Sequence, residues 1–274
     1  MKYRIEKDTL GEVEVPADVY YGPQTQRSVN NFKIATDISR MPEEVIEAFA
    51  YLKKGAALAN KDAGVLSPEK CELIGKVCDE ILAGKLNDSF PLIVWQTGSG
   101  TQTNMNVNEV IANRAEESLG GRRGEYRRVH PLHHVNLHQS TNDVFPTALK
   151  IAATDGLRRL EKAVAALQTS FQTKEREFAH IVKVGRTQLQ DACPMTLGAE
   201  FSAWAEAFAR DRWRIFKCEE RLRVINLGGT AVGTGLNAPA GFAEAGELLP
   251  RSFAEASHFE CRFCSYAERC WGGA

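Results

Sequence analysis

Uncharged hydrogen-bond donors are concentrated in one stretch of the sequence, Thr97–Glu109. Hydroxyls, amides and glycines follow one another there with almost no charge, between an apolar segment and residues that can continue as a helix. Such groups, together with backbone N–H groups exposed by glycine, bind carboxylate oxygens without bringing a titratable group. The stretch therefore indicates a pocket for a small anion, although Ser, Thr and Asn are also good helix N-caps.

Three further polar blocks follow along the chain. Gln139–Asn142 repeats the same chemistry just ahead of a predicted helix, whose free N–H groups and partial positive charge favour an anion. Gly185–Asp191 offers a hydroxyl, amides and a cation in a tight turn. Asn226–Asn237 is rich in glycine and can bind phosphate, but no Gly-Lys-Ser/Thr triplet follows and no predicted strand precedes it. A P-loop or dinucleotide-binding fold is therefore not indicated.

Two clusters of histidine or cysteine allow a metal-site interpretation. Four histidines lie within the nine residues His130–His138, and His258 is followed by Cys261, Cys264 and Cys270. The first cluster offers no pair at ligand spacing on a helix face with a carboxylate partner. The second has no further clean Cys-x-x-Cys or histidine pair to complete a site. We expect no metal site at either cluster.

The bulk composition is that of an ordinary soluble globular protein of one or two domains. The 274 residues are 43% hydrophobic and 25% charged, and the formal net charge is -1. This balance offers no electrostatic footprint for nucleic acid or for an anionic membrane. The apolar runs are too short to span a bilayer, and residues 1–8 lack the apolar core of a signal peptide. We therefore expect a cytoplasmic protein with reduced thiols.

Helical periodicity dominates the elements that must position these blocks. A short strand is predicted over residues 11–16, and helices are predicted to begin at Pro42 and at Ser67. Apolar residues at three- and four-residue steps predict two long helices, over residues 147–180 and 195–226. Two long antiparallel helices with a short connection are typical of a bundle, and further helices or subunits must cover them.

These elements predict a mainly α fold in which a small N-terminal α domain with a short β element precedes a long-helix bundle. We expect the N-terminal domain over residues 1–139 and an incomplete central helical bundle over residues 140–247. Residues 248–274 combine a high cysteine density with no clear amphipathic pattern, so they are interpreted as a divergent tail.

The polar blocks, in this order, resemble the fumarase/aspartase superfamily, and within it the class II fumarate hydratases most. The resemblance rests on Trp95–Asn106, on Arg4–Asp8 and on Tyr21–Ser28, and it extends over roughly residues 3–240. It implies a fumarase-like helical fold and a homotetramer in which three subunits build each active site. It also implies a lyase of the tricarboxylic acid cycle that interconverts fumarate and (S)-malate by adding or removing water, with no cofactor and no metal.

The resemblance also assigns roles to individual residues. By position, the residues that bind the small dicarboxylate substrate would be Ser99, Gly100, Thr101, Ser140, Thr141, Asn142 and Thr187. The reaction removes a proton α to a carboxylate and leaves an aci-carboxylate dianion. Dense hydrogen-bond donors around that carboxylate stabilise the developing charge, as an oxyanion hole does.

Three departures from the fumarase pattern qualify this assignment. Gln188 occupies the position of the family's catalytic histidine, and an amide cannot serve as a general acid or base. Some aspartases share this third block and Gln139–Asp143, so the alternative function is aspartate ammonia-lyase, which forms fumarate and ammonia. In the fumarases' secondary anion site, only Arg127 and His130 remain, because Leu132-His133 replaces an Asn-Asp pair.

The third departure is the family's signature loop, Gly-Ser-Ser-x-Met-Pro-x-Lys-x-Asn-Pro, which these 274 residues do not contain. In the family it supplies the catalytic serine base. The likeness fades after Glu247, which suggests a C-terminally truncated or frame-shifted product. The third hypothesis is therefore an inactive fragment that binds substrate without turning it over.

Overall fold

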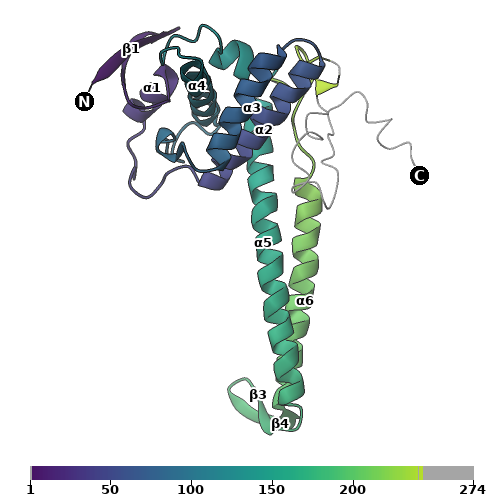
Figure 1. Cartoon of the computed structure of the whole chain (residues 1–274). Coiled ribbons are helices and arrows are strands. Elements are labelled where there is room, and N and C mark those ends of the chain that lie inside the picture. Colours follow the sequence, from purple (N-terminus) through teal and green to yellow (C-terminus); the bar gives the residue numbers. More distant parts are fainter. Residues whose placement is uncertain (1, 240, 243–274) are drawn as a thin grey trace. The chain divides into compact units, whose positions relative to one another are not determined.

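The computed structural model describes residues 2–239, 241 and 242 and divides the chain into two compact units. The first unit joins the residues up to Ala152 to the segment that begins at Arg223, and the second comprises Ala153–Leu222. Helix α5 (Thr141–Glu177) continues from the first unit into the second (Figure 1). The fold is mainly helical with two short antiparallel sheets, which confirms the predicted fold class. The domain boundaries proposed above remain predictions.

The first unit consists of short strands and helices that lie close to one another along the chain. Its elements before α5 are β1 (Tyr3–Asp8), β2 (Gly11–Pro16), α1 (Pro23–Asn31), α2 (Glu43–Asp62), α3 (Pro68–Leu82), η1 (Asn87–Ser89), α4 (Thr101–Ser118) and η2 (Pro131–Val135). The predicted strand at residues 11–16 is confirmed, and it pairs with β1 through a tight turn. Ser67 caps α3 as predicted, because its hydroxyl accepts a hydrogen bond from Lys70 N.

The core of the first unit lies among α2, α3 and α4. Phe49 and Leu52 of α2, Ile74 of α3 and Val110 and Ile111 of α4 are each 0% exposed. Burying a side chain of this kind stabilises the fold by about 1.5–3 kcal/mol. Helix α4 also buries polar side chains, which its sequence supplies at almost every turn. They are Thr103, Asn104, Asn106, Asn108, Glu109, Asn113 and Glu116. Their burial makes α4 the element that organises the polar interior.

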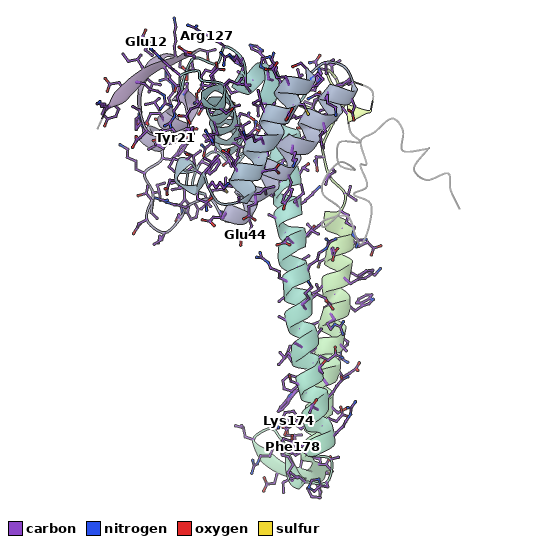
Figure 2. The ribbon with its side chains drawn as sticks, viewed as in Figure 1. Glu12, Tyr21, Glu44, Arg127, Lys174 and Phe178 are labelled. Carbon is purple, nitrogen blue, oxygen red and sulfur yellow. The ribbon has the colours of Figure 1, made fainter. Side chains whose placement is uncertain are left out.

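The second unit contains the remainder of α5, the hairpin β3 (Val182–Thr187) and β4 (Gln190–Thr196), and α6 (Leu197–Leu222). Within it, Phe171 of α5 stacks on Phe208 of α6 at a centroid distance of 5.4 Å. Near the hairpin, the Lys174 ammonium lies 5.2 Å from the Phe178 ring centre, and Figure 2 labels both side chains. The pairing of two long helices agrees with the predicted bundle geometry.

The predicted start of the first long helix was wrong, and one hairpin was not predicted. Helix α5 begins at Thr141 and not after Pro146, because proline is tolerated close to a helix start and here lies inside the helix. The third polar block contains the predicted tight turn, but this turn ends a β-hairpin whose strands were not predicted. In the described part of the chain, no helix combines the length and the apolar character that a membrane span requires.

Candidate functional site

Helix α4 begins in a way that exposes backbone donors. Gly100 is its N-cap and has a φ of +73°, a left-handed conformation that favours glycine. A Cβ on Gly100 would lie 2.3 Å from the ring of Phe145, so a larger residue must displace that ring. Gln96 Oε1 accepts hydrogen bonds from the backbone N–H of Thr103 at 3.1 Å and from its hydroxyl at 3.0 Å. The amide of Gln96 thereby holds the first turn of α4 in place.

Three exposed hydroxyls surround this helix start. Ser99 Oγ lies 3.4 Å from Thr97 Oγ1 and 3.2 Å from Thr101 Oγ1. The unpaired N–H groups of a helix N-terminus carry a partial positive charge that attracts anions. The predicted residues Ser99, Gly100 and Thr101 therefore lie together at one helix N-terminus, where hydroxyls and backbone donors can bind a carboxylate.

The second predicted group lies at the start of α5. Asp143 Oδ1 accepts a hydrogen bond from Ser140 N at 3.1 Å, and Ser140 Oγ accepts one from Asn142 N at 3.3 Å. The bond to Asp143, the third residue of the helix, is one half of a capping box, while the Ser140 hydroxyl accepts from the second residue instead of the third. Ser140 and Thr141 are half-buried and Asn142 is exposed, so all three can reach a ligand at this helix N-terminus.

The glycine-rich fourth block lies against this second group. Asn142 Nδ2 donates to the carbonyl oxygen of Ala231 at 2.7 Å, and Thr230 N donates to Asp143 Oδ2 at 2.9 Å. Ser140 and the segment 230–237 line a pocket of about 330 Å³. Sequence reasoning did not include this segment in the site. Its glycines and hydroxyls were the available signal, but they were tested only against the phosphate-binding motif.

The first and second polar groups are joined inside the same unit. Asn104 Nδ2 donates to Thr141 Oγ1 at 3.2 Å and to Asn136 Oδ1 at 3.1 Å. Lys53 Nζ donates to Asn104 Oδ1 at 2.7 Å and to Gln139 Oε1 at 2.8 Å. Sequence reasoning missed Lys53, although this lysine lies among the apolar positions of the predicted helix that contains it. The two helix starts that carry the predicted residues are therefore parts of one polar network.

Burial shifts the pKa of two charged groups in this network. Removal from water raises the pKa of Asp143 to about 6, against the opposing effect of the N–H groups that the carboxylate accepts. Removal from water lowers the pKa of Lys53 to about 7, and the nearby Asp143 charge acts in the opposite direction. Both groups can change their protonation close to neutral pH.

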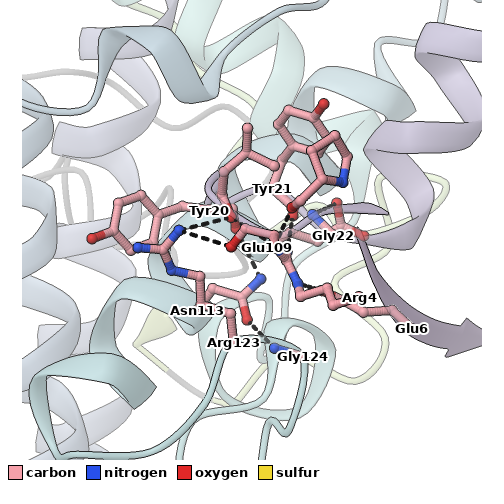
Figure 3. Close-up of polar contacts among 12 residues, drawn as sticks. Arg4, Glu6, Tyr20, Tyr21, Gly22, Glu109, Asn113, Arg123 and Gly124 are labelled. Carbon is pink, nitrogen blue, oxygen red and sulfur yellow. Dashed lines mark hydrogen bonds and ion pairs between the residues drawn. The ribbon is translucent and has the colours of Figure 1, made fainter. Parts of the chain in front are cut away.

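The last residue of the first block has a separate, structural role. Glu109 Oε2 accepts a hydrogen bond from Gly22 N at 2.9 Å (Figure 3). The same oxygen accepts from Thr25 N at 3.1 Å and Thr25 Oγ1 at 2.6 Å, and Oε1 accepts from Gln24 N at 2.8 Å. Its carboxylate therefore occupies the N-terminus of α1. A Cβ on Gly22 would lie 2.4 Å from the Tyr126 hydroxyl, so glycine permits this close approach. Burial nevertheless raises the pKa of Glu109 to about 7.

The residues predicted as a remnant anion site do not form a cluster of free donors. Arg127 points outward with 77% of its side chain exposed, and Figure 2 labels it; its nearest carboxylate is that of Glu125, at 3.9 Å. His130 Nδ1 accepts hydrogen bonds from Leu132 N at 3.1 Å and His133 N at 3.3 Å, so it caps η2. Burial lowers the pKa of His130, which favours the neutral ring that this capping requires.

Thr187 and Gln188 belong to the second unit. They lie at the exposed end of the β3–β4 hairpin, where Thr187 pairs with Gln190 across a two-residue turn. Gln188 and Leu189 have φ values of +52° and +62°, which identifies a type I′ turn built without glycine or asparagine. Leu189 is fully exposed. Backbone strain of this kind is often retained where a loop has a binding or catalytic role.

Of the two clusters that allow a metal-site interpretation, only the one at His130–His138 lies within the described residues. Among the described residues, no group of three His, Cys, Asp or Glu side chains is arranged to hold a metal ion. Within the cluster at His130–His138, His134 Nδ1 accepts a hydrogen bond from His130 N at 2.9 Å, so one ring nitrogen serves the backbone. The cluster from His258 to Cys270, and the tail that contains it, lie outside the described residues.

The sequence is similar to known proteins over most of its length. A model of a family described as lyases matches residues 11–250. A protein of Haemophilus ducreyi named class II fumarate hydratase is 55% identical over 243 residues, which are 88% of this chain and 52% of that protein. The class II fumarate hydratase of Bacillus subtilis is 50% identical over 245 residues, 89% of this chain and 52% of that protein. The chain thus spans about half the length of the curated relatives it matches.

Solved structures agree with the sequence matches. The class II fumarase of Schistosoma mansoni matches with a TM-score of 0.88 at 38% identity, covering 93% of this chain and 55% of that one. A fumarate lyase:delta crystallin of Brucella melitensis, bound to cobalt, matches with a TM-score of 0.88 at 41% identity, covering 98% of this chain and 58% of that one. The resemblance stated from the polar blocks is therefore confirmed.

Proposed function

Because this chain belongs to the lyase family whose model matches residues 11–250, we propose that it binds fumarate and (S)-malate and supports their interconversion. The 50–55% identity to proteins named class II fumarate hydratase supports this choice of reaction. The substrate is then a small dicarboxylate that gains or loses water across a carbon–carbon double bond. A homotetramer, a cytoplasmic location and a place in the tricarboxylic acid cycle belong to the same proposal.

The observation that carries this proposal is the joining of two anion-binding helix N-termini by Asn104 and Thr141 at 3.2 Å. One substrate carboxylate meets Ser99, Gly100 and Thr101 at the start of α4. The other end of the substrate meets Ser140, Thr141 and Asn142 at the start of α5. Aligned N–H groups and hydroxyls stabilise the negative charge that grows on a carboxylate as the neighbouring carbon loses its proton.

Thr187 and Gln188 complete the proposed site from another subunit. The β3–β4 hairpin presents both residues at an exposed end, as a contribution to a neighbouring site requires. The hydroxyl of Thr187 and the amide of Gln188 are further donors for a carboxylate. Neither group can remove the carbon-bound proton at neutral pH, because neither titrates in that range.

The reaction is tested with the purified 274-residue chain and (S)-malate or aspartate, by following the absorbance of fumarate. In a preparation that supplies a base for the carbon-bound proton, we expect fumarate to form from malate and not from aspartate. Formation of fumarate from aspartate alone would favour aspartate ammonia-lyase. Gln188 supports that alternative, because an amide stands where the fumarases have a titratable histidine.

A third outcome separates binding from turnover. The 274 residues contain no Gly-Ser-Ser-x-Met-Pro loop that would carry a serine base. If neither substrate turns over, the assay is repeated with a second polypeptide that spans the remaining half of the Haemophilus ducreyi relative. Activity restored only by that polypeptide would show that this chain supplies binding residues and not the base. Turnover by neither preparation, with no fumarate binding, would contradict the proposal.

A further inference from the structure

The ammonium group of Lys53 lies inside the first unit, and the residue is 0% exposed. It donates hydrogen bonds to three amide oxygens: Asn104 Oδ1 at 2.7 Å, Gln139 Oε1 at 2.8 Å and Asn136 Oδ1 at 3.0 Å. All three acceptors are neutral side chains. Buried lysines are usually paired with a carboxylate, because an unpaired charge is costly to remove from water. An apolar side chain could fill this buried position equally well, so packing alone does not explain the charge.

The amide of Asn104 connects this cation to the start of α5. Since its Oδ1 accepts from Lys53, its Nδ2 is the donor, and Nδ2 donates to Thr141 Oγ1 at 3.2 Å. The oxygen of Thr141 is therefore the acceptor in this bond, and its own proton is directed elsewhere. Thr141 is half-buried, so this proton can reach a ligand at the helix N-terminus.

We propose that Lys53 is a positioning residue that acts through Asn104 to turn the Thr141 hydroxyl toward a substrate carboxylate. A charged donor strengthens the hydrogen bonds that continue from it, so the ammonium also makes Thr141 a better donor. The role rests on the proposed function, because it assumes that Thr141 binds a dicarboxylate.

The charged and titratable groups around Lys53 determine how its protonation depends on pH. Asp143 of α5 favours the ammonium form, and its carboxylate is held by the backbone N–H groups of Ser140 and Thr230. A negative charge on Cys78 of α3 would also favour the ammonium form of Lys53. Burial raises the pKa of the Cys78 thiol to about 12, however, so the thiol stays neutral at physiological pH. A bound dianion adds negative charge at the far end of the chain of hydrogen bonds. By linkage, it must raise the pKa of Lys53, which burial holds at about 7.

The first test compares binding of succinate, an unreactive dicarboxylate, by calorimetry at pH 6.5. We expect Lys53→Met to weaken binding by about tenfold or more, the usual effect of losing a charge-assisted hydrogen bond. Lys54→Met is the matched control, because the Lys54 ammonium is partly exposed and pairs with Asp79 at 2.6 Å. The control should bind succinate within about twofold of the unmodified chain.

A double-mutant cycle with Thr141→Val separates positioning from general support of the fold. If Lys53 acts through Thr141, the double variant binds succinate no more weakly than Thr141→Val alone. If Lys53 only supports the fold, the two losses multiply, and that result would overturn the role.

A second measurement needs no substitution and covers the case in which Lys53→Met does not fold. The Lys53 Nζ resonance is titrated by heteronuclear NMR with and without saturating succinate. We expect succinate to raise the pKa of Lys53 and to leave the Lys54 titration unchanged; an unchanged Lys53 titration would overturn the role. If the unmodified chain does not bind succinate, the proposed dicarboxylate site is wrong and this role fails with it. If Lys53→Met binds succinate normally, only the role of Lys53 is wrong.

Discussion

The side-chain amide of Asn142 donates a hydrogen bond to the carbonyl oxygen of Ala231 at 2.7 Å, across 89 positions of sequence. This bond, with that from Thr230 N to Asp143 Oδ2, fastens the glycine-rich segment to the start of α5. A ligand that reaches Ser140 must therefore share its pocket with residues 230–237. The segment is therefore one wall of this pocket, which its glycine-rich sequence alone did not indicate.

Gly100→Ala should destabilise the start of α4, although the substitution changes no charge. The new Cβ would lie 2.3 Å from the Phe145 ring, and the alanine would have to adopt a φ of +73°. Overpacking and the left-handed conformation together should cost about 2–4 kcal/mol in the free energy of unfolding, measured by urea denaturation.

Gly98→Ala is the matched control, because nothing lies within 4 Å of its Cβ position. It should change the free energy of unfolding by about 1 kcal/mol or less. Gly100→Ala should cost less free energy of unfolding in the Phe145→Ala background than in the unmodified chain. An equal cost in both backgrounds would show that the steric explanation is wrong.

Glu109 should make stability depend on pH in the opposite sense to most carboxylates. Burial raises its pKa from 4.5 to about 7 in the folded state, so the folded state holds this proton more tightly than the unfolded state. The associated stability is fully present below pH 4.5 and is lost as pH rises through 7. Relative to Glu109→Gln, the free energy of unfolding should fall by up to about 3 kcal/mol between these limits. The exposed change Glu12→Gln is the control, and a flat difference for Glu109→Gln would contradict the prediction.

His138 should carry its proton on Nδ1 when neutral. Asn60 Nδ2 donates to Leu137 O at 3.1 Å, so Asn60 Oδ1 must be the acceptor in its 2.7 Å contact with His138 Nδ1. Burial lowers the pKa of His138 below 6.5. Nitrogen-15 NMR should therefore show the Nδ1–H tautomer and a titration below pH 6.5, whereas His130, whose Nδ1 accepts two backbone hydrogen bonds, should show the Nε2–H tautomer. An Nε2–H tautomer would show that the Asn60 amide is oriented the other way.

The turn of the β3–β4 hairpin should become more stable when its strain is relieved. Leu189→Gly should add about 0.5–1 kcal/mol to the free energy of unfolding, because glycine accepts a φ of +62° without steric cost. Chemical denaturation followed by the fluorescence of Trp204 and Trp213 in the second unit measures this. Leu189→Ala, which removes the exposed side chain and keeps the strain, is the control. Equal stabilisation by both variants would show that exposure of the leucine, and not strain, was the cost.

The sequence was most informative where residue type and local position act together. Ser99, Gly100 and Thr101 were expected in an anion-binding stretch, with a capped helix start as the alternative, and they lie at the start of α4. The block that contains them was treated as a single cradle, but Glu109 lies two turns further along α4, where its carboxylate binds the start of α1. Composition cannot show which face of a helix a residue occupies, so it did not indicate the structural role of Glu109.

Contacts between distant segments were not predictable from local patterns. Lys53 interrupts an apolar helix face, a visible anomaly, but its partners Asn136 and Gln139 lie more than 80 positions away. The hairpin that carries Gln188 was not predicted because its strands bury little: β3 has two half-buried positions, and the first five residues of β4 are exposed. The binding roles assigned to Thr187 and Gln188 remain predictions.

The discontinuous first unit has a consequence for synthesis on the ribosome. Asp143 and Thr230, which bond to each other, are 87 residues apart in sequence. At about 5–20 residues per second, Asp143 is synthesised roughly 4 to 17 s before Thr230. During that interval the nascent chain has most of its core helices but lacks the segment that closes the pocket. A translational pause between the two positions would lengthen the life of this open intermediate and its exposure to chaperones and proteases.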